Sequence, residues 1–176
     1  MKTSIEIPKG YTVKKEGKKI IISGNGKENK RELFYPLIDI IFTPESIELQ
    51  SKKENKNVKK MMMTFKSHLE NMIMGLKKPF IYKLKICASH YPMTVKVEGN
   101  QVIIHNYLGE KVPRKCGIVG NAKVTVNKDE IIVESVDKEA AGMTAGIIEK
   151  ISQIRIHDRR IFQDGIYIIE KDGYKI

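Results

Sequence analysis

Arginine is the residue type in this chain whose placement best indicates a binding chemistry. Four of the five arginines lie in the second half of the chain, in two short segments, and they are Arg114, Arg155, Arg159 and Arg160. A guanidinium group binds a phosphate through two parallel hydrogen bonds and stacks on bases, whereas a lysine ammonium acts as a point charge. The arginines therefore predict phosphate or nucleic-acid binding more specifically than the larger number of lysines does.

The two arginine-containing segments also carry other side chains that contact nucleic acids. The first segment, 105–115, has a glycine turn, Tyr107, and cations on either side of a proline. The second segment, 155–167, follows a predicted helix directly and interleaves arginines with His157, Gln163 and two aromatic residues. Such side chains beside a helix end can contact phosphates, 2′-hydroxyls and exposed bases together. The two segments therefore favour RNA as the ligand.

Some of these residues have a plainer alternative. Phe162 and Tyr167 have apolar neighbours, and we favour a place in the hydrophobic core for both. For Arg159 and Arg160 the alternative is a solvated charged surface, although adjacent cations repel each other unless an anion lies beside them. The hypothesis of an RNA site predicts that changing both arginines to alanine weakens RNA binding and leaves the fold intact.

The sequence lacks the motifs of catalysis, metal binding and cofactor binding. Gly24-Asn25-Gly26-Lys27 is glycine-rich but lacks the spacing and the Ser/Thr of a phosphate-binding P-loop, so it predicts a hairpin turn. The four histidines and two cysteines show no metal-ligand spacing. Asp158 and Asp164 lie in a basic stretch, where pairing with arginine or forming a turn is favoured over acid–base catalysis. We therefore expect no enzymatic activity, no cofactor and no metal.

The chain as a whole is strongly basic. Its 176 residues include 32 Lys and Arg against 21 Asp and Glu, a net charge of +11, and its 41% of hydrophobic residues are enough for a buried core. Most of the net charge lies in residues 1–85, which hold 19 cations, eighteen of them lysines, against 9 acids. A domain this basic often binds polyanions, and the alternative is that the lysines only keep the surface solvated.

The cellular compartment can be predicted from cysteine use and from the apolar segments. Cys87 and Cys116 form no C-x-x-C pair, and we expect both to be free thiols of a reducing cytosol. The first residues contain no apolar region typical of a signal peptide, and no apolar run approaches the length of a transmembrane helix. We therefore expect a cytoplasmic protein that is not inserted in a membrane.

An internal repeat organises the chain. Residues 12–22, TVKKEGKKIII, align with residues 94–104, TVKVEGNQVII, and seven of the eleven positions are identical. Each copy reads as strand, glycine turn and strand, which predicts a hairpin. The pattern continues with a strand at 46–49 that corresponds to one at 130–133, and each of these precedes a helical segment. The repeat therefore predicts two similar modules produced by duplication.

Each predicted helix has one apolar face, because apolar residues recur every three or four positions. The first face runs from Val58 to Leu76, with Asn57 as the expected N-cap and with a glycine near the C-terminal end. The second face runs from Ala141 to Ile154, with Asp137 as the expected N-cap, and its alanines and glycines predict close packing on a sheet.

The order of these elements predicts the fold class. Each module is expected to end in an extended apolar run, at 80–86 and at 165–169. Strands come in runs and do not alternate with helices, which indicates the α+β class. We expect two tandem duplicated modules, 8–86 and 90–172, each an antiparallel β-sheet packed on one main α-helix.

Five sequence motifs make the chain similar to a known family. They are SHLENMIMG (67–75), HYPMTVKVEG (90–99), NYLGEK (106–111), DKEAAGMTAGIIE (137–149) and DRRIFQDGIYI (158–168). Together with the repeat, they resemble the ribosomal large-subunit protein L-six family in its archaeal/eukaryotic branch. The resemblance covers nearly the whole chain and is weakest in the lysine-rich stretch 27–60.

This resemblance implies a non-enzymatic, structural constituent of the large subunit of cytoplasmic ribosomes. It implies binding to large-subunit rRNA near the sarcin–ricin loop and the stalk base, beside neighbouring ribosomal proteins and close to where translation GTPases dock, with no membrane partner. It also implies that the second module holds the rRNA chiefly. The residues that it implies are Asn106, Gly109, Lys111, Arg114, Lys115, Arg155, Arg159, Arg160 and Gln163, with His90 and Tyr91 at the module join.

One alternative of a different class stays open. A basic protein-interaction module could dock partners through the edges of its sheets, with its basic face incidental. The ratio of absorbance at 260 and 280 nm of the purified protein separates the two hypotheses, because the chain has seven Tyr and no Trp and absorbs weakly itself.

Overall fold

The computed structural model describes residues 2–8, 10–43, 46–155, 158 and 160–176. The chain divides into two compact units, Met1–Lys78 and Pro79–Ile176. Each unit combines antiparallel sheets with one long helix, so the predicted α+β class is confirmed. Each unit, however, contains two sheets where the sequence predicted one.

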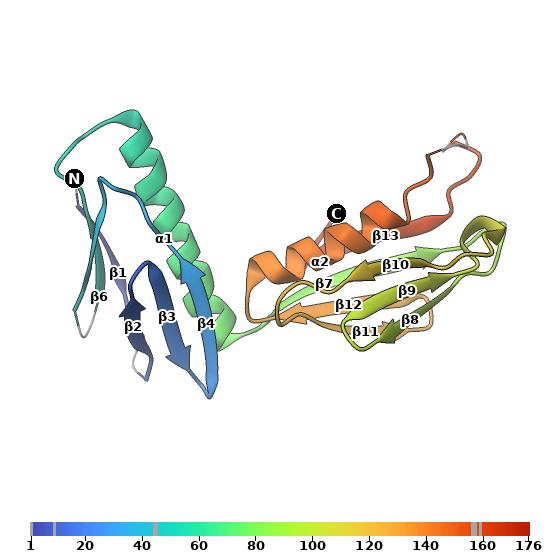
Figure 1. Cartoon of the computed structure of the whole chain (residues 1–176), viewed down its shortest axis with the longest axis horizontal. Coiled ribbons are helices and arrows are strands. Elements are labelled where there is room, and N and C mark those ends of the chain that lie inside the picture. The colour runs from blue at the N-terminus through green and yellow to red at the C-terminus, as the bar shows by residue number, and fades with distance from the viewer. Residues whose placement is uncertain (1, 9, 44–45, 156–157, 159) are drawn as a thin grey trace. The chain divides into compact units, whose positions relative to one another are not determined.

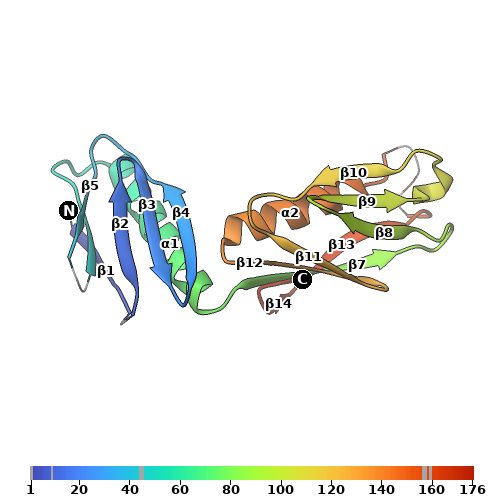
Figure 2. The same ribbon diagram turned by 60° about the horizontal axis from the view of Figure 1, so that its bottom comes forward.

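The first unit consists of six strands followed by a helix. The elements are β1 (Lys2–Glu6), β2 (Thr12–Glu16), β3 (Lys19–Gly24), β4 (Lys27–Glu32), β5 (Asp39–Phe42), β6 (Ser46–Gln50) and α1 (Lys56–Lys77). The strands form two antiparallel sheets of three strands each, in the orders β1-β6-β5 and β2-β3-β4. Helix α1 lies behind the β2-β3-β4 sheet in Figure 2, where it covers one face of that sheet.

The hairpins of the first unit form where glycine turns are predicted. Gly17 takes a positive φ of 62° between β2 and β3. Asn25 and Gly26, with φ of 53° and 72°, make the two-residue turn between β3 and β4, which is the turn that matches the twist of paired strands. The glycine-rich segment is therefore a hairpin, as predicted.

Helix α1 buries the predicted apolar face almost completely. Its buried residues are Val58, Met62, Phe65, Leu69, Met72, Ile73, Gly75 and Leu76. The N-cap is Asn55, two residues before the predicted Asn57, and its side chain makes no capping hydrogen bond. Gly75 does not end the helix, because it is buried inside the last turn and the apolar face continues to Leu76.

The second unit begins with the same order of six strands and a helix, and then adds two strands. The elements are β7 (Phe80–Cys87), β8 (Thr94–Glu98), β9 (Gln101–His105), a short 3-10 turn η1 (Tyr107–Gly109), β10 (Arg114–Gly117), β11 (Lys123–Asn127), β12 (Glu130–Ser135), α2 (Lys138–Ile151), β13 (Gly165–Lys171) and β14 (Tyr174–Lys175). They form a three-stranded sheet, β10-β9-β8, and a five-stranded sheet, β11-β12-β7-β13-β14, and α2 packs against both (Figure 1).

Strand β7 makes the observed division of the chain differ from the predicted one. The sequence pattern predicts that residues 80–86 end a first module, 8–86, and that a second module, 90–172, follows. The structure pairs β7 with β12 on one side and with β13 on the other, so it is the central strand of the second unit. The division therefore falls after Lys78.

Helix α2 lies close to its sheets because its buried face is made of small residues. Asp137 caps its N-terminus as predicted, and its carboxylate accepts a hydrogen bond from the Glu139 N–H at 3.0 Å. Ala141 and Ala145 are fully buried, and a methyl group added at Gly142 would lie 3.3 Å from the Tyr82 hydroxyl oxygen. The predicted close packing of this helix is therefore confirmed.

Two further observations bear on the predicted compartment. Cys87 and Cys116 are both free thiols, as expected. Within the described ranges, neither long helix has the length and apolar character needed to cross a membrane.

Candidate nucleic-acid interface

The two arginine-containing segments lie side by side at one end of the second unit. The loop after β9 and the loop after α2 project from the same end in both Figure 1 and Figure 2. Hydrogen bonds connect the two loops, because the Tyr107 hydroxyl donates to the Ser152 carbonyl at 2.5 Å and Arg114 Nη1 donates to the Ile151 carbonyl at 2.6 Å. The fold thus brings together segments that the sequence analysis could treat only as separate candidates.

The loop after β9 is tightly curled. Asn106, Leu108 and Gly109 all have positive φ, at 56°, 48° and 76°. The Asn106 side-chain amide holds the loop by donating to the Pro92 carbonyl at 2.9 Å. The φ of Gly109 is one that favours glycine, and a methyl group there would be in ordinary contact with the ring of Tyr91, at 3.5 Å, so that ring lies next to the loop. Asn106 and Gly109 therefore shape the loop.

Arg114 is held by three hydrogen bonds. Its Nε and Nη2 donate to the two carboxylate oxygens of Glu110 at 2.8 Å and 2.5 Å, and its Nη1 reaches Ile151. Its guanidinium also lies 4.0 Å from the centre of the Tyr107 ring. The hydrogen bonds from Arg114 hold the pKa of the Glu110 carboxyl below its ordinary value. Arg114 therefore fastens the loop to the C-terminal end of α2, where a cation is favoured by the helix dipole.

Ser152 is the buried contact point beneath the two loops. Its hydroxyl donates to the Glu149 carbonyl at 3.0 Å and accepts from the Ile166 N–H at 3.0 Å, while its own carbonyl accepts from Tyr107. A methyl group at Gly165 would lie 3.2 Å from that carbonyl oxygen, so glycine allows β13 to start this close to Ser152. Burial raises the pKa of the Tyr107 hydroxyl, which therefore remains a donor at neutral pH.

Asp164 fastens the second loop to the join before β8. Its carboxylate is 2% exposed and accepts hydrogen bonds from the Ser89 N–H at 2.5 Å, the His90 N–H at 3.0 Å and the His90 ring at 2.5 Å. The His90 ring also stacks on Phe162, with 4.5 Å between ring centres. Burial alone would raise the pKa of Asp164, but the hydrogen bonds from His90 and Ser89 outweigh it, and the pKa lies below its ordinary value.

Among the residues that the structure describes in these two loops, three are exposed cations. Lys111, Arg155 and Arg160 all have exposed side chains, and Gln163 is exposed in the same loop as Arg160. Arg160 is paired only loosely with Asp158, at 3.4 Å, and its side chain is 91% exposed. These cations are presented to solvent on loops that hydrogen bonds at Tyr107, Ser152 and Asp164 fasten to the unit, and such fastening lowers the cost in ordering of binding a polyanion.

The structure separates the predicted site residues by role. Asn106, Gly109, Arg114 and His90 hold the loops in place, and Tyr91 lies against the first loop with its side chain 49% exposed. Lys115 neighbours Arg114 on β10, and successive side chains of a strand point to opposite faces, so Lys115 does not join Arg114. Arg159 lies outside the described residues.

The two aromatic residues of the second segment differ from each other. Phe162 is half-buried against the core of the unit, as predicted. Tyr167 is 42% exposed, so its predicted place in the core is wrong. The prediction for Asp158 is confirmed, since it pairs with Arg160 and accepts from the Arg160 N–H at 2.9 Å. Asp164 pairs with a histidine, where the sequence favoured an arginine or a turn.

Sequence reasoning missed Glu110 and Ser152 altogether. Glu110 lies four residues before Arg114, a separation that indicates a pair only on a helix, and here a loop brings the two together. Nothing local to Ser152 indicates its partners, which come from the loop after β9 and from β13. In the part of the chain that the structure describes, no three His, Cys, Asp or Glu side chains lie close enough together to hold a metal ion.

Comparison with known proteins identifies the family. The family model described as "Ribosomal protein L6" matches residues 91–165, which include both loops of the interface. A protein of Methanococcus vannielii called "Large ribosomal subunit protein uL6" is 42% identical over 173 residues, covering 98% of this chain and 95% of the relative. The chain belongs to the ribosomal protein L6 family.

Other L6-family relatives agree over nearly their full length. Proteins with the same description from Methanobrevibacter smithii and Methanothrix thermoacetophila are 39% and 41% identical, covering 98% and 95% of this chain and 97% and 95% of the relatives. The similarity therefore extends through both units and is not confined to the matched segment, and the archaeal relatives agree with the predicted branch of the family.

Removing one hydroxyl tests how the candidate interface of this L6-family chain is fastened. Tyr107→Phe keeps the ring that packs against Arg114 and deletes the donor to the Ser152 carbonyl. We expect the second unit to lose about 1–2 kcal/mol of stability, because a buried carbonyl loses its partner. Urea unfolding of the variant measures the loss, and Tyr91→Phe, which removes the hydroxyl of a residue that is 49% exposed, is the matched control. An equal effect of both changes would contradict this account of the hydroxyl.

Proposed function

We propose that this chain is a non-enzymatic, structural constituent of the large ribosomal subunit of the cytoplasm, and that it binds large-subunit rRNA through the end of its second unit. The observation that carries the proposal is the set of exposed cations, Lys111, Arg155 and Arg160, on two loops that hydrogen bonds at Tyr107, Ser152 and Asp164 fasten to the unit. The relatives named as large-subunit proteins support it.

The mechanism is electrostatic and mechanical. Cations on the two loops neutralise phosphates and release their counterions, so affinity falls steeply as salt rises. The fixed loops then hold the RNA segments that they contact in one geometry. Within the interface, Asn106, Gly109, Arg114 and His90 act by positioning, and Lys111, Arg155, Arg160 and Gln163 make the contacts. We include Tyr91, Lys115 and Arg159 as further rRNA contacts.

The place on the subunit is a finer part of the proposal. We infer that the interface binds rRNA near the sarcin–ricin loop at the stalk base, beside other ribosomal proteins and close to where translation GTPases dock. The resemblance of the NYLGEK and DRRIFQDG segments to the archaeal and eukaryotic branch of the family supports this location.

Duplication of one ancestral module is also part of the proposal. Strands β2 and β3 pair in the same register as β8 and β9, since Val13 opposes Ile22 as Val95 opposes Ile104. In both units the sixth strand, β6 or β12, lies between the first and fifth strands of that unit. The chain then continues from this sixth strand into the helix. In this correspondence β7 is the counterpart of β1, which supports two modules divided near Lys78.

A protein-docking function is the second candidate, and one observation favours it. Phe34, Leu37 and Ile41 are 57%, 38% and 43% exposed around β5, and among the described strands β5 pairs with β6 alone. Exposed apolar side chains on an edge strand are typical of a surface that accepts another chain.

Sedimentation of a cell lysate through a sucrose gradient tests the proposed function. We expect the protein to co-migrate with the large subunit and with intact ribosomes, and to remain there after a moderate-salt wash. The ratio of absorbance at 260 and 280 nm of the purified protein gives a quick independent check for bound RNA. A protein found only in the light fractions would contradict the proposal and move protein docking to first place.

A further inference from the structure

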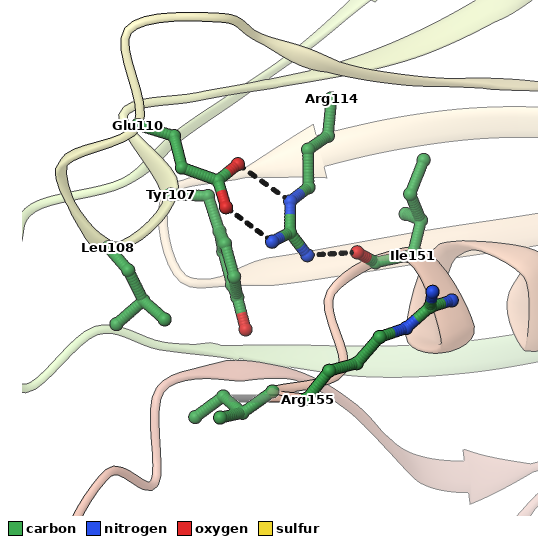
Figure 3. A pocket seen from close by; sticks show the side chains of 7 residues that line it. Tyr107, Leu108, Glu110, Arg114, Ile151 and Arg155 are labelled. Atoms are coloured by element: carbon green, nitrogen blue, oxygen red, sulfur yellow. Dashed lines mark hydrogen bonds and ion pairs between the residues drawn. The ribbon is translucent and has the colours of Figure 1, made fainter. Parts of the chain in front are cut away.

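The two loops of the interface enclose a pocket that the proposed function does not by itself require. Its volume is about 460 Å³, and its lining residues are Tyr107, Leu108, Glu110, Arg114, Ile151, Ile154 and Arg155 (Figure 3). This volume lies in the range of about 300–1,000 Å³ that is usual for small-molecule sites. A pocket of this size at an RNA-binding interface has room for one nucleotide.

Aliphatic side chains form much of the pocket wall. Ile154 is 4% exposed, and Ile151 and Leu108 are half-buried beside it. The Arg114 guanidinium covers one face of the Tyr107 ring, and Tyr107 is only 1% exposed, so this ring offers little surface to a ligand. A flat group entering the pocket would therefore pack between aliphatic side chains. Such packing removes apolar surface from water and suits a planar ring.

The polar wall of the pocket offers acceptors and donors together. A carboxylate has about four acceptor positions and a guanidinium has five N–H donors. Among the described contacts, Glu110 uses two acceptor positions and Arg114 uses three N–H groups. Both side chains remain partly accessible, at 40% and 27% of their surface. A ligand that both donates and accepts along one edge fits this pair.

Leu108 supplies a second, independent observation. It has φ 48° and ψ 34°, a left-handed conformation that costs a residue with a side chain about 1–2 kcal/mol. Such strain persists where the surroundings fix it, and it clusters at sites that bind ligands. Here the strained conformation belongs to a residue that lines the pocket, as Figure 3 shows.

The positive charge of Arg155 indicates that the ligand of the pocket carries an anionic group. Arg155 lines the side of the pocket away from Glu110 in Figure 3, and its side chain is exposed. The occupant should therefore combine a planar ring that donates and accepts hydrogen bonds with an anionic group. A nucleotide has this combination.

We propose that the pocket binds one unpaired nucleotide of the RNA. An amino or ring N–H of the base donates to Glu110, a ring nitrogen or carbonyl of the base accepts from Arg114, and the phosphate contacts Arg155. This inference rests on the proposed function, because it takes the occupant to be part of the bound RNA.

Methyl NMR of the full chain tests the pocket directly. We expect AMP, CMP, GMP and UMP to shift the methyl signals of Leu108, Ile151 and Ile154. Ribose 5-phosphate, which has no base, should leave these signals unmoved. No shift at these methyls with any of the four nucleotides, or equal shifts with ribose 5-phosphate, would overturn the proposal.

Two variants locate the nucleotide within the pocket. Ile151→Phe fills the pocket and should abolish the nucleotide-induced shifts of Leu108 and Ile154, whereas Ile147→Phe, one turn earlier on α2 and half-buried but outside the pocket, should leave them intact. Arg155→Gln should remove the preference for AMP over adenosine, which we expect to be about fivefold. Equal effects of the two isoleucine variants, or an unchanged preference in Arg155→Gln, would contradict the proposed pose.

The test separates this inference from the proposed function. Binding of large-subunit rRNA is measured independently by filter retention of the unmodified chain. Retained rRNA with no nucleotide in the pocket overturns the inference alone. If the chain retains no rRNA but nucleotides still bind in the pocket, the proposed function is overturned and the pocket assignment stands.

Discussion

Asp164→Ala is expected to destabilise the second unit by about 2–3 kcal/mol, because a buried carboxylate that accepts three hydrogen bonds is lost. For a domain of this size, each kcal/mol lowers the melting temperature by about 4–8 °C. Thermal and urea unfolding measure the loss. Weaker rRNA binding should accompany it, because Asp164 fastens the loop that carries Arg160 to the join before β8.

Asp158→Ala is the matched control for this change. It removes a carboxylate from the same loop, but the Asp158 side chain is about half exposed and its ion pair with Arg160 is long, at 3.4 Å. We expect it to cost less than about 1 kcal/mol, as exposed ion pairs do. Equal destabilisation by the two changes would show that loss of negative charge, and not the fastening by Asp164, determines stability here.

The pH dependence gives a second check on Asp164. Its pKa in the folded protein lies below the ordinary value of 3.8, so its contribution is complete above about pH 4 and is lost as the pH falls through the folded pKa. We therefore expect the stability difference between the unmodified chain and Asp164→Asn to be constant near neutral pH. The difference should shrink below about pH 4, and one that grows there would contradict the lowered pKa.

Changing Arg155 and Arg160 together to glutamine is expected to weaken binding to large-subunit rRNA by at least about tenfold at moderate salt. The slope of log affinity against log salt should fall by about 1.4–1.8, since each phosphate contact contributes about 0.7–0.9. Both side chains are exposed, so the stability of the second unit should not change. A salt titration by filter binding measures the affinity and the slope in one experiment.

Lys52 and Lys53 provide the charge-matched control. Changing both to glutamine removes the same two charges from the first unit, where both side chains are exposed. The first unit holds 17 Lys and Arg against 9 Asp and Glu, so it could attract RNA by its charge alone. We expect a smaller change of slope than in the arginine variant. Equal changes would show that the net charge of the protein, and not the interface, determines affinity.

The interface shows which residues a sequence motif can assign and which it cannot. The motifs singled out two segments, and the structure places both at one end of the second unit. Within the segments, residue type alone does not show which side chains are exposed to a ligand and which hold the loops in place. Arg114 and Arg155 are the same residue type, yet Arg114 is held by Glu110 and Ile151, whereas Arg155 is exposed at the pocket. The difference arises from the position of α2, which the segments themselves do not encode.

Apart from the N-cap of α1, which lies two residues before the predicted one, the sequence by itself determined the features that depend on neighbours along the chain. The spacing of apolar residues located the buried faces of α1 and α2, the glycine turns located the hairpins, and Asp137 marked the start of α2. These features follow from the periods of helices and strands and from local backbone preferences, which a few adjacent residues fix. The motifs also sufficed to place the chain in its family.

Only the tertiary structure decided which distant segments meet. By its sequence pattern, the apolar strand at Phe80–Cys87 could end the first unit or begin the second. Its pairing with β12 and β13 places it in the second unit. The contacts of Asp164 with His90 and of Tyr107 with Ser152 join residues 74 and 45 positions apart. Such contacts depend on how whole elements pack, because no local period links the two partners. The fastening of the interface is therefore a property of the packed unit, while its cations are visible in the sequence.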